Sequence, residues 1–209
     1  MILDRATHWD DRYSRVGSSR VSWYDPDLHV SLQLLGEAGA GPGDSVVDVG
    51  GGASSLTDHL LDRGLTDLTV VDVSAAALDE SQARLAGRAP AAHVDWVHAD
   101  LLDWHPHRRW DVWHDRAVFH FLTQPDQVDA YRGLAARSVV EGGHLVVGTF
   151  GPQGPLTCSG LPVARYSSDE LAHVFADQFE LTAAVAEDHM TPSGDVQQFS
   201  WVLLRRRSG

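Results

Sequence analysis

Two kinds of hydrophobic pattern alternate along the chain. Short runs of apolar residues predict buried strands, and segments whose apolar residues recur every three or four positions predict helices. The short runs lie at residues 44–50, 68–74, 93–100, 110–117 and 143–150. The helical segments between them lie at 55–64, 74–87 and 125–143. Because strands that alternate with helices form parallel sheets covered on both faces, this order predicts an α/β fold.

Both ends of the chain depart from this alternation. After residue 166 the pattern predicts a helix at 167–177 and then an antiparallel pair of strands at 178–187 and 196–207. Before residue 40 two helical segments flank an aromatic loop, and we expect them to cap the open end of the sheet. We therefore expect one domain over residues 1–209, with a helical cap at 1–40 and an α/β core at 41–209.

Charge and composition narrow the range of partners. Acidic residues outnumber basic residues by 29 to 16, so the formal net charge is -13 at pH 7. Such a surface repels the phosphates of nucleic acids and anionic lipids, and we expect a small molecule or a protein as partner instead. The single cysteine, Cys158, cannot form an internal disulfide, and the sequence shows neither a secretory signal nor a membrane-spanning run. These features predict a soluble, cytoplasmic protein.

A three-glycine turn, Gly50 to Gly52, follows the first predicted strand and precedes a helix. Ligands of open α/β sheets bind at the carboxyl ends of the strands, and glycines let the backbone approach them closely. Asp48 stands at the lip of this turn, where its carboxylate would repel the phosphates of a dinucleotide. The dinucleotide pattern G-x-G-x-x-G also needs a glycine where Ser55 stands. A cationic ligand without phosphate, S-adenosylmethionine, fits this turn better.

Two further acidic residues end neighbouring strands. Asp72, followed by Val73, ends the second strand about twenty residues after the glycines, where a carboxylate can accept hydrogen bonds from both ribose hydroxyls. Asp100 follows the third strand and is expected to accept a hydrogen bond from an adenine amino group, with Leu101 supporting the ring. Taken alone, Asp72 fits NAD equally well, and Asp100 is equally well explained as a helix cap.

In order and spacing, the segments DVGGGAS, VVDVS, HADLLDW and WHDRAVFHFL resemble the successive motifs of class I S-adenosylmethionine-dependent methyltransferases. The family's first motif, D-x-G-x-G-x-G, falls on Asp48, Gly50 and Gly52, and Ser54 replaces its last glycine. The resemblance implies a Rossmann-like, doubly wound sheet of seven strands in the order 3-2-1-4-5-7-6, with strand 7 antiparallel. More narrowly, the chain resembles a small bacterial group related to the lysine methyltransferases of citrate synthase and elongation factor 1A.

In those enzymes an acidic-basic pair follows the fourth strand. Asp115 and Arg116 stand at the matching positions, with arginine in place of the usual lysine. We expect both to serve catalysis together with His120, whose neutral imidazole can accept a proton near neutral pH. The alternatives are that Asp115 and Arg116 simply pair with each other and that His120 is a structural histidine. His114 is either a cofactor contact or a half-buried partner of backbone carbonyls.

Aromatic residues are dense near the N-terminus. Because aromatic faces attract cations, Trp9 and Tyr13 are expected to cover the methionine end of the cofactor. Trp23 and Tyr24 are candidate contacts of the acceptor, and packing of the cap is the alternative role for these aromatic residues.

A long loop at residues 151–167 follows the fifth strand and contains three prolines and three glycines. It is too long for an ordinary connection in a compact domain, so it is predicted to be a lid. Arg165 and Tyr166 in this loop offer donors to an anionic or hydroxylated acceptor. Ion pairing of Arg165 and packing of Tyr166 are the alternatives.

The sequence thus predicts a methyltransferase that uses S-adenosylmethionine, releases S-adenosylhomocysteine and methylates an O, N or S atom of a small molecule. A protein-lysine methyltransferase is the second hypothesis, since an acidic surface attracts a lysine-bearing partner. An NAD-binding oxidoreductase or a non-catalytic binder is the third. Histidine and cysteine residues show no compact cluster with metal-ligand spacing, so no metal is expected.

Overall fold

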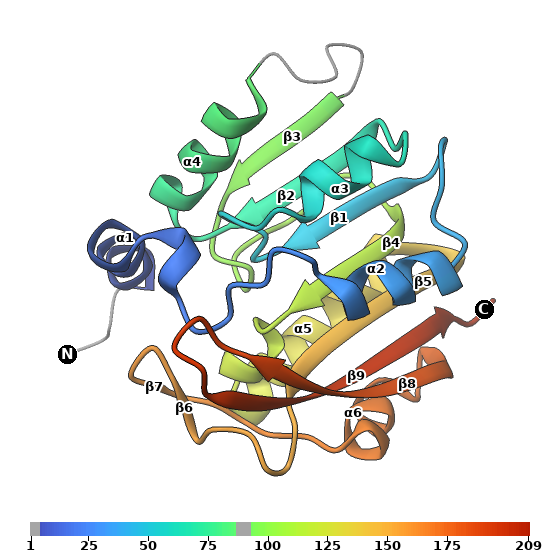
Figure 1. Ribbon diagram of the computed structural model, residues 1–209. Coiled ribbons are helices and arrows are strands. Elements are labelled where there is room, and N and C mark those ends of the chain that lie inside the picture. Colours follow the sequence, from blue (N-terminus) through green and yellow to red (C-terminus); the bar gives the residue numbers. More distant parts are fainter. Residues whose placement is uncertain (1–4, 87–92) are drawn as a thin grey trace.

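A mixed sheet forms the middle layer of the protein in a computed structural model that describes residues 5–86 and 93–209 (Figure 1). Its strand order is β3-β2-β1-β4-β5-β9-β8. The strands are β1 (Ser45–Val49), β2 (Asp67–Asp72), β3 (His93–His98), β4 (Trp110–Arg116), β5 (Val139–Phe150), β8 (Phe179–Met190) and β9 (Val196–Arg206). A separate short hairpin consists of β6 (Thr157–Cys158) and β7 (Leu161–Pro162).

Strands β1 to β5 pair in parallel, and β9 is antiparallel to both of its neighbours, β5 and β8. Without the hairpin this order is 3-2-1-4-5-7-6 with strand 7 antiparallel, so the predicted topology is confirmed. One boundary was predicted wrongly. The helix expected over 125–143 ends at Ser138, because Val139 already pairs with Trp110 of β4 and is buried there.

Helices cover both faces of the sheet. They are α1 (Arg5–Val16), α2 (His29–Glu37), α3 (Leu56–Asp62), α4 (Ala75–Leu85), α5 (Pro125–Ser138) and α6 (Ser168–Phe175). Alternate residues of a strand face opposite sides. Trp113 and Leu145 therefore join the core under α5 and α6, whereas Val112 and Val146 join the core under α2 and α3.

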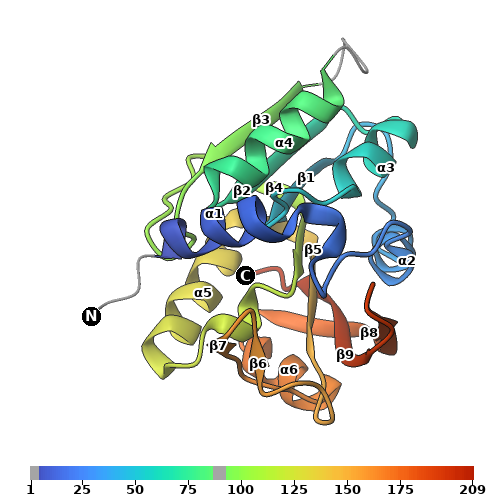
Figure 2. The same ribbon diagram turned by 60° about the vertical axis from the view of Figure 1, so that its left-hand side comes forward.

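Helix α1 lies across the carboxyl ends of the strands and packs on α4 (Figure 2). Helix α2 was expected to cap this end as well, but it packs on a face of the sheet, where Leu34 and Leu35 join the core. Asp10 of α1 accepts hydrogen bonds from the Ser74 hydroxyl at 2.6 Å and from the Ala76 amide at 3.2 Å. The Ser74 hydroxyl also accepts a hydrogen bond from the Ala77 amide at 3.2 Å, so Ser74 caps α4. The cap is therefore anchored at the start of α4.

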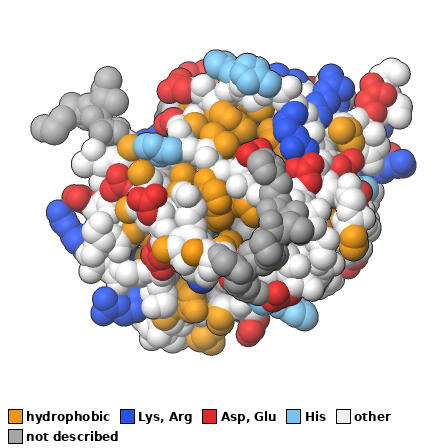
Figure 3. Space-filling view, turned by 90° about the horizontal axis from the view of Figure 1, so that it is seen from above, with side chains coloured by type: hydrophobic (Ala, Val, Ile, Leu, Met, Phe, Trp, Pro, Cys, Tyr) orange, Lys and Arg blue, Asp and Glu red, His pale blue; other side chains and the backbone are white. Residues whose placement is uncertain are grey.

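Acidic and basic side chains of the described residues are interspersed on the face seen in Figure 3, with hydrophobic side chains between them. None of the helices in the described part of the chain has the length and apolar character that crossing a membrane requires.

Candidate active site

Two adjoining cavities lie at the carboxyl ends of the central strands. The larger has a volume of about 260 Å³ and the smaller about 50 Å³. Five residues line both cavities: Tyr13, Trp23, Val49, Gly50 and Arg116. The cavities are thus two parts of one site, between the ends of β1, β2 and β4 and the N-terminal segment.

Asp48 of β1 is held by its neighbour in the sheet. It stands beside His114 of β4, whose Nδ1 donates a hydrogen bond to Asp48 Oδ1 at 2.8 Å. The other ring nitrogen, Nε2, lies 2.9 Å from the Ser31 hydroxyl of α2. All three side chains are buried. His114 therefore positions Asp48 and also lines the smaller cavity. Its ring nitrogens contact a carboxylate and a hydroxyl and not the backbone carbonyls considered as alternative partners.

The second carboxylate oxygen of Asp48, Oδ2, is buried and has no hydrogen-bond partner among the described residues. Asp48 lines the smaller cavity. Leaving a buried carboxylate oxygen without a donor is costly, so a cationic or hydrogen-bonding group of a ligand would stabilise this arrangement.

The glycine turn packs directly over two carboxylates. A side chain at Gly51 would collide with the Asp48 carboxylate, and one at Gly52 would collide with that of Asp72. Gly50 has φ +66° and lies against Val118, so a side chain there would be both strained and obstructed. The sequence motif assigned roles to Gly50 and Gly52 but gave none to Gly51, whose contact with Asp48 depends on the fold of the turn.

Asp72 ends β2 and lines the larger cavity together with Val73. The Ser74 amide donates a hydrogen bond to Asp72 Oδ1 at 2.8 Å. Burial, and to a smaller extent the neighbouring charge of Asp48, raise the pKa of Asp72 to about 7. Hydrogen bonds from the hydroxyl groups of a ligand would stabilise the ionised form of such a buried carboxylate.

Asp100 and Leu101, which follow β3, also line the larger cavity. Asp100 Oδ1 accepts a hydrogen bond from the Leu102 amide at 3.0 Å, so it caps its own turn as well as facing the cavity. Arg5 of α1 donates to both carboxylate oxygens at 3.2 and 3.1 Å. Arg5 carries no local sequence signal, because its partner lies far along the chain.

The chain resembles known proteins in both sequence and structure. Residues 46–143 match the family model described as a methyltransferase domain. The chain is 27% identical over 148 residues to nodulation protein S of Rhizobium tropici, a match that covers 71% of this chain and 58% of that protein. The chain is thus similar to methyltransferases in sequence over residues 46–143, and it shares the fold of class I methyltransferases.

Two solved structures share this methyltransferase fold. One is the N-methyltransferase NodS from Bradyrhizobium japonicum WM9 in complex with S-adenosyl-l-homocysteine, with a TM-score of 0.67, 18% identity, and coverage of 99% of this chain and 91% of that chain. The other is the Burkholderia thailandensis 1,6-didemethyltoxoflavin-N1-methyltransferase, with 1,6-didemethyltoxoflavin and S-adenosylhomocysteine bound. Its TM-score is 0.75, at 19% identity, with coverage of 100% of this chain and 93% of that chain. The narrower resemblance to lysine methyltransferases stays a hypothesis.

The three residues expected to serve catalysis in this methyltransferase fold do not lie together. Arg116 lines both cavities, donates through Nη1 to the Trp23 carbonyl and lies 3.6 Å through Nη2 from Asp25 Oδ2. Asp115 points the other way, as expected for successive residues of a strand. Its carboxylate accepts hydrogen bonds from the amides of Val118 and Phe119 and is outside both cavities. It fixes the turn after β4 and does not pair with Arg116.

His120 also lies outside both cavities. Its ring is fully buried between Phe121 and Phe150, and Nδ1 accepts a hydrogen bond from the Phe150 amide at 3.4 Å. Burial lowers the pKa of His120 to about 3, which makes it a poor base at neutral pH. The structure therefore corrects the catalytic assignment: His120 is a packed, neutral histidine under the turn.

The aromatic residues of the cap both line the site and pack on each other. Trp9, Tyr13 and Trp23 line the larger cavity, and Tyr24 lines the smaller one. Trp9 makes edge-to-face contacts with Trp23 at 5.6 Å and with Phe121 at 5.2 Å between ring centroids. The two expected roles, ligand contact and cap packing, are thus compatible in the same side chains.

The loop at 151–167 contributes to the site through its hairpin. Cys158, Leu161 and Pro162 line the larger cavity. Arg165 donates to the carbonyls of Pro152 and Gly154 at 2.8 and 3.1 Å, and Tyr166 packs on the Phe119 ring. Neither Arg165 nor Tyr166 lines either cavity, which corrects their assignment as substrate contacts: both stabilise the loop.

Proposed function

We propose that the protein is an S-adenosylmethionine-dependent methyltransferase that acts on a small-molecule acceptor. One observation carries the proposal: three acidic residues from successive strand ends, Asp48, Asp72 and Asp100, surround one pair of cavities under a glycine turn. Phosphate-free, cationic ligands suit such a site, whereas the pyrophosphate of NAD would be repelled by Asp48.

The residues present fit S-adenosylmethionine. The unpartnered Oδ2 of Asp48 suits the ammonium group, and Asp72 is the residue that would accept hydrogen bonds from the ribose hydroxyls. Asp100 and Leu101 would contact the adenine. The structures of the two solved relatives contain S-adenosylhomocysteine, which supports this assignment of the cofactor.

When bound, the cofactor supplies a methyl group on a sulfonium, which an O, N or S nucleophile displaces in line. The chain's contribution is to orient the reactants and exclude water, which is worth about 7 to 11 kcal/mol in favourable cases. Trp9, Trp23 and Phe121 form an apolar wall of the larger cavity, next to Cys158. Burial raises the pKa of the Cys158 thiol to about 11, so this thiol is no base at neutral pH.

Three features support a small molecule over a protein lysine as the acceptor. Residues of the cap and of the hairpin line the larger cavity together, so both segments border the site. An open groove beside Asp115 would favour a protein acceptor, but Asp115 is buried under the turn after β4. Both solved relatives are named N-methyltransferases, one of them with a small heterocycle bound, which favours nitrogen among the possible acceptor atoms.

Isothermal titration calorimetry of the full chain with S-adenosylmethionine, S-adenosylhomocysteine and NAD tests the proposal. We expect micromolar binding of the first two and none of NAD. Asp72→Ala should weaken both adenosyl ligands by roughly a hundredfold, because it removes the acceptor of two ribose hydroxyls. Binding of NAD alone would overturn the proposal.

A further inference from the structure

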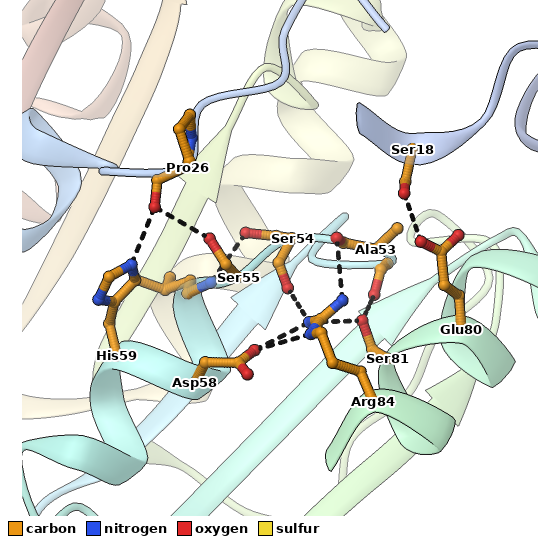
Figure 4. Close-up of polar contacts among 12 residues, drawn as sticks. Ser18, Pro26, Ala53, Ser54, Ser55, Asp58, His59, Glu80, Ser81 and Arg84 are labelled. Atoms are coloured by element: carbon orange, nitrogen blue, oxygen red, sulfur yellow. Dashed lines mark hydrogen bonds and ion pairs between the residues drawn. The ribbon is translucent and has the colours of Figure 1, made fainter. Parts of the chain in front are cut away.

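Helix α4 contacts the glycine turn through the side chains of Ser81 and Arg84 (Figure 4). Ser81 donates a hydrogen bond from its hydroxyl to the Gly52 carbonyl at 2.6 Å. Arg84 donates from Nη2 to the Ser54 carbonyl at 2.6 Å and from Nη1 to the Ala53 carbonyl at 3.5 Å. Two side chains of one helix thus bind three consecutive carbonyl oxygens of the turn.

Arg84 is itself fixed in place. Its Nε donates to Asp58 Oδ2 at 3.0 Å, and its Nη2 also donates to the Ser81 hydroxyl at 3.1 Å. Residues 81 and 84 are three positions apart, so they lie on the same face of α4. Asp58 belongs to α3, the helix that follows the turn. Arg84 therefore connects α3, α4 and the turn between β1 and α3.

These bonds determine how the turn faces the site. A peptide group is planar, with its N–H opposite its carbonyl, so fixing the oxygen also fixes the direction of the amide. Ala53 and Ser54 line the smaller cavity, next to Gly51 and Asp48. Gly51 and Gly52 pack closely against the carboxylates of Asp48 and Asp72. A small shift of the turn would therefore change the surroundings of both carboxylates, one in each cavity.

We propose that Ser81 and Arg84 are positioning residues for the cofactor: they hold the glycine turn in its ligand-binding conformation without touching the ligand. Neither residue lines either cavity. The inference rests on the proposed function, because the ligand that the turn receives is the methionine part of S-adenosylmethionine. A preformed turn binds more tightly because less ordering is needed on binding.

Other contacts secure the same region without Arg84. The Pro26 carbonyl of the cap accepts hydrogen bonds from the Ser55 hydroxyl at 3.5 Å and from His59 Nε2 at 3.0 Å. Ser18 donates to Glu80 of α4 (Figure 4). The cap and both helices should therefore keep their places when Arg84 is replaced, and the effect of the substitution should be confined to the turn.

Titration calorimetry with S-adenosylhomocysteine on the full-length variants tests the inference. Arg84→Met removes the guanidinium that donates to the turn, to Asp58 and to Ser81, and it should raise the Kd roughly tenfold or more. Arg84→Lys should recover part of the lost affinity, because a single ammonium group reaches fewer carbonyls. The control is Arg132→Met. Arg132 of α5 also pairs with carboxylates, Asp129 and Asp177, and its side chain is 31% exposed against 33% for Arg84. It lies away from both cavities, so Kd should not change.

Hydrogen exchange of residues 51–55 without ligand supplies a second measurement. We expect faster exchange in Arg84→Met than in the wild type or in Arg132→Met, at similar unfolding temperatures for the two variants. If Arg84→Met fails to fold, Ser81→Ala decides, since it removes one hydroxyl and should raise Kd several-fold. If the wild type binds S-adenosylhomocysteine and both Arg84→Met and Ser81→Ala bind it with the same Kd, the inference is wrong and the proposed function stands. If the wild type does not bind it, the proposed function is wrong as well.

Discussion

Two buried carboxylates, Asp48 and Asp72, determine which ligands the site suits. Asp48 is bonded on one oxygen and unpartnered on the other, and Asp72 is bonded to the Ser74 amide while it faces the larger cavity. Each was predicted from the sequence, because an acidic residue at the carboxyl end of a parallel strand must lie at the ligand-binding edge. The partner of Asp48 was not predicted: His114 is 66 residues away along the chain, and no local pattern reports such a contact.

The pKa of Asp72 leads to a prediction about pH. Burial raises this pKa to about 7, whereas the unfolded chain ionises near the ordinary value of about 4. Between these two values the folded protein binds the proton more tightly, so ionisation works against folding. The free energy of unfolding of the wild type, relative to Asp72→Asn, should therefore fall as pH rises from about 4 to about 7. Urea unfolding at several pH values, without ligand, measures the difference, and parallel curves for the two proteins would contradict it.

At the scale of elements, the turn after β4 depends on Asp115. Its carboxylate accepts hydrogen bonds from the amides of Val118 and Phe119 at 3.0 and 3.2 Å and from the Tyr131 hydroxyl at 2.6 Å. Ala117 in this turn has a left-handed backbone, φ 67°, and lines the larger cavity. The buried acid thus holds a strained turn at the site.

Asp115→Ala should lower the free energy of unfolding by about 2 to 4 kcal/mol, because it leaves two buried donors and one part-buried donor without an acceptor. Tyr131→Phe, which removes one of the donors, should cost about 1 kcal/mol. The control is Asp129→Ala on the exposed side of α5, where loss of a surface ion pair with Arg132 should change stability by less than about 1 kcal/mol. Chemical denaturation measures all three, and wild-type stability in Asp115→Ala would show that the turn does not need this acid.

Elements were predictable where the pattern is local. Short apolar runs identified the central strands, which are almost wholly buried, and the helical segment predicted from residue 74 corresponds to α4, which Ser74 caps. The end of α5 was missed, because Val139 fits a helical pattern and only its pairing with β4 makes it a strand residue. His120, Arg165 and Tyr166 had suitable chemistry at suitable places in the sequence, but the direction of each side chain is set by packing in three dimensions. Arg84 was missed for the same reason.

At the scale of the whole molecule, the sheet order and the comparisons agree on the class I methyltransferase fold. The order could be predicted because the motifs resemble those of class I methyltransferases, and this resemblance implies the strand order. The acceptor could not, since the larger cavity is formed by segments far apart in the chain, from Trp9 to Pro162. The acceptor that fits depends on how these segments come together in the folded chain.

A crystal structure of the protein grown with S-adenosylhomocysteine would test the proposed cofactor site directly. We expect the adenosyl group in the larger cavity, with the ribose hydroxyls on Asp72 and the adenine beside Asp100 and Leu101, and the methionine part under the glycine turn next to Asp48. S-adenosylhomocysteine bound elsewhere, or with its ribose away from Asp72, would contradict it.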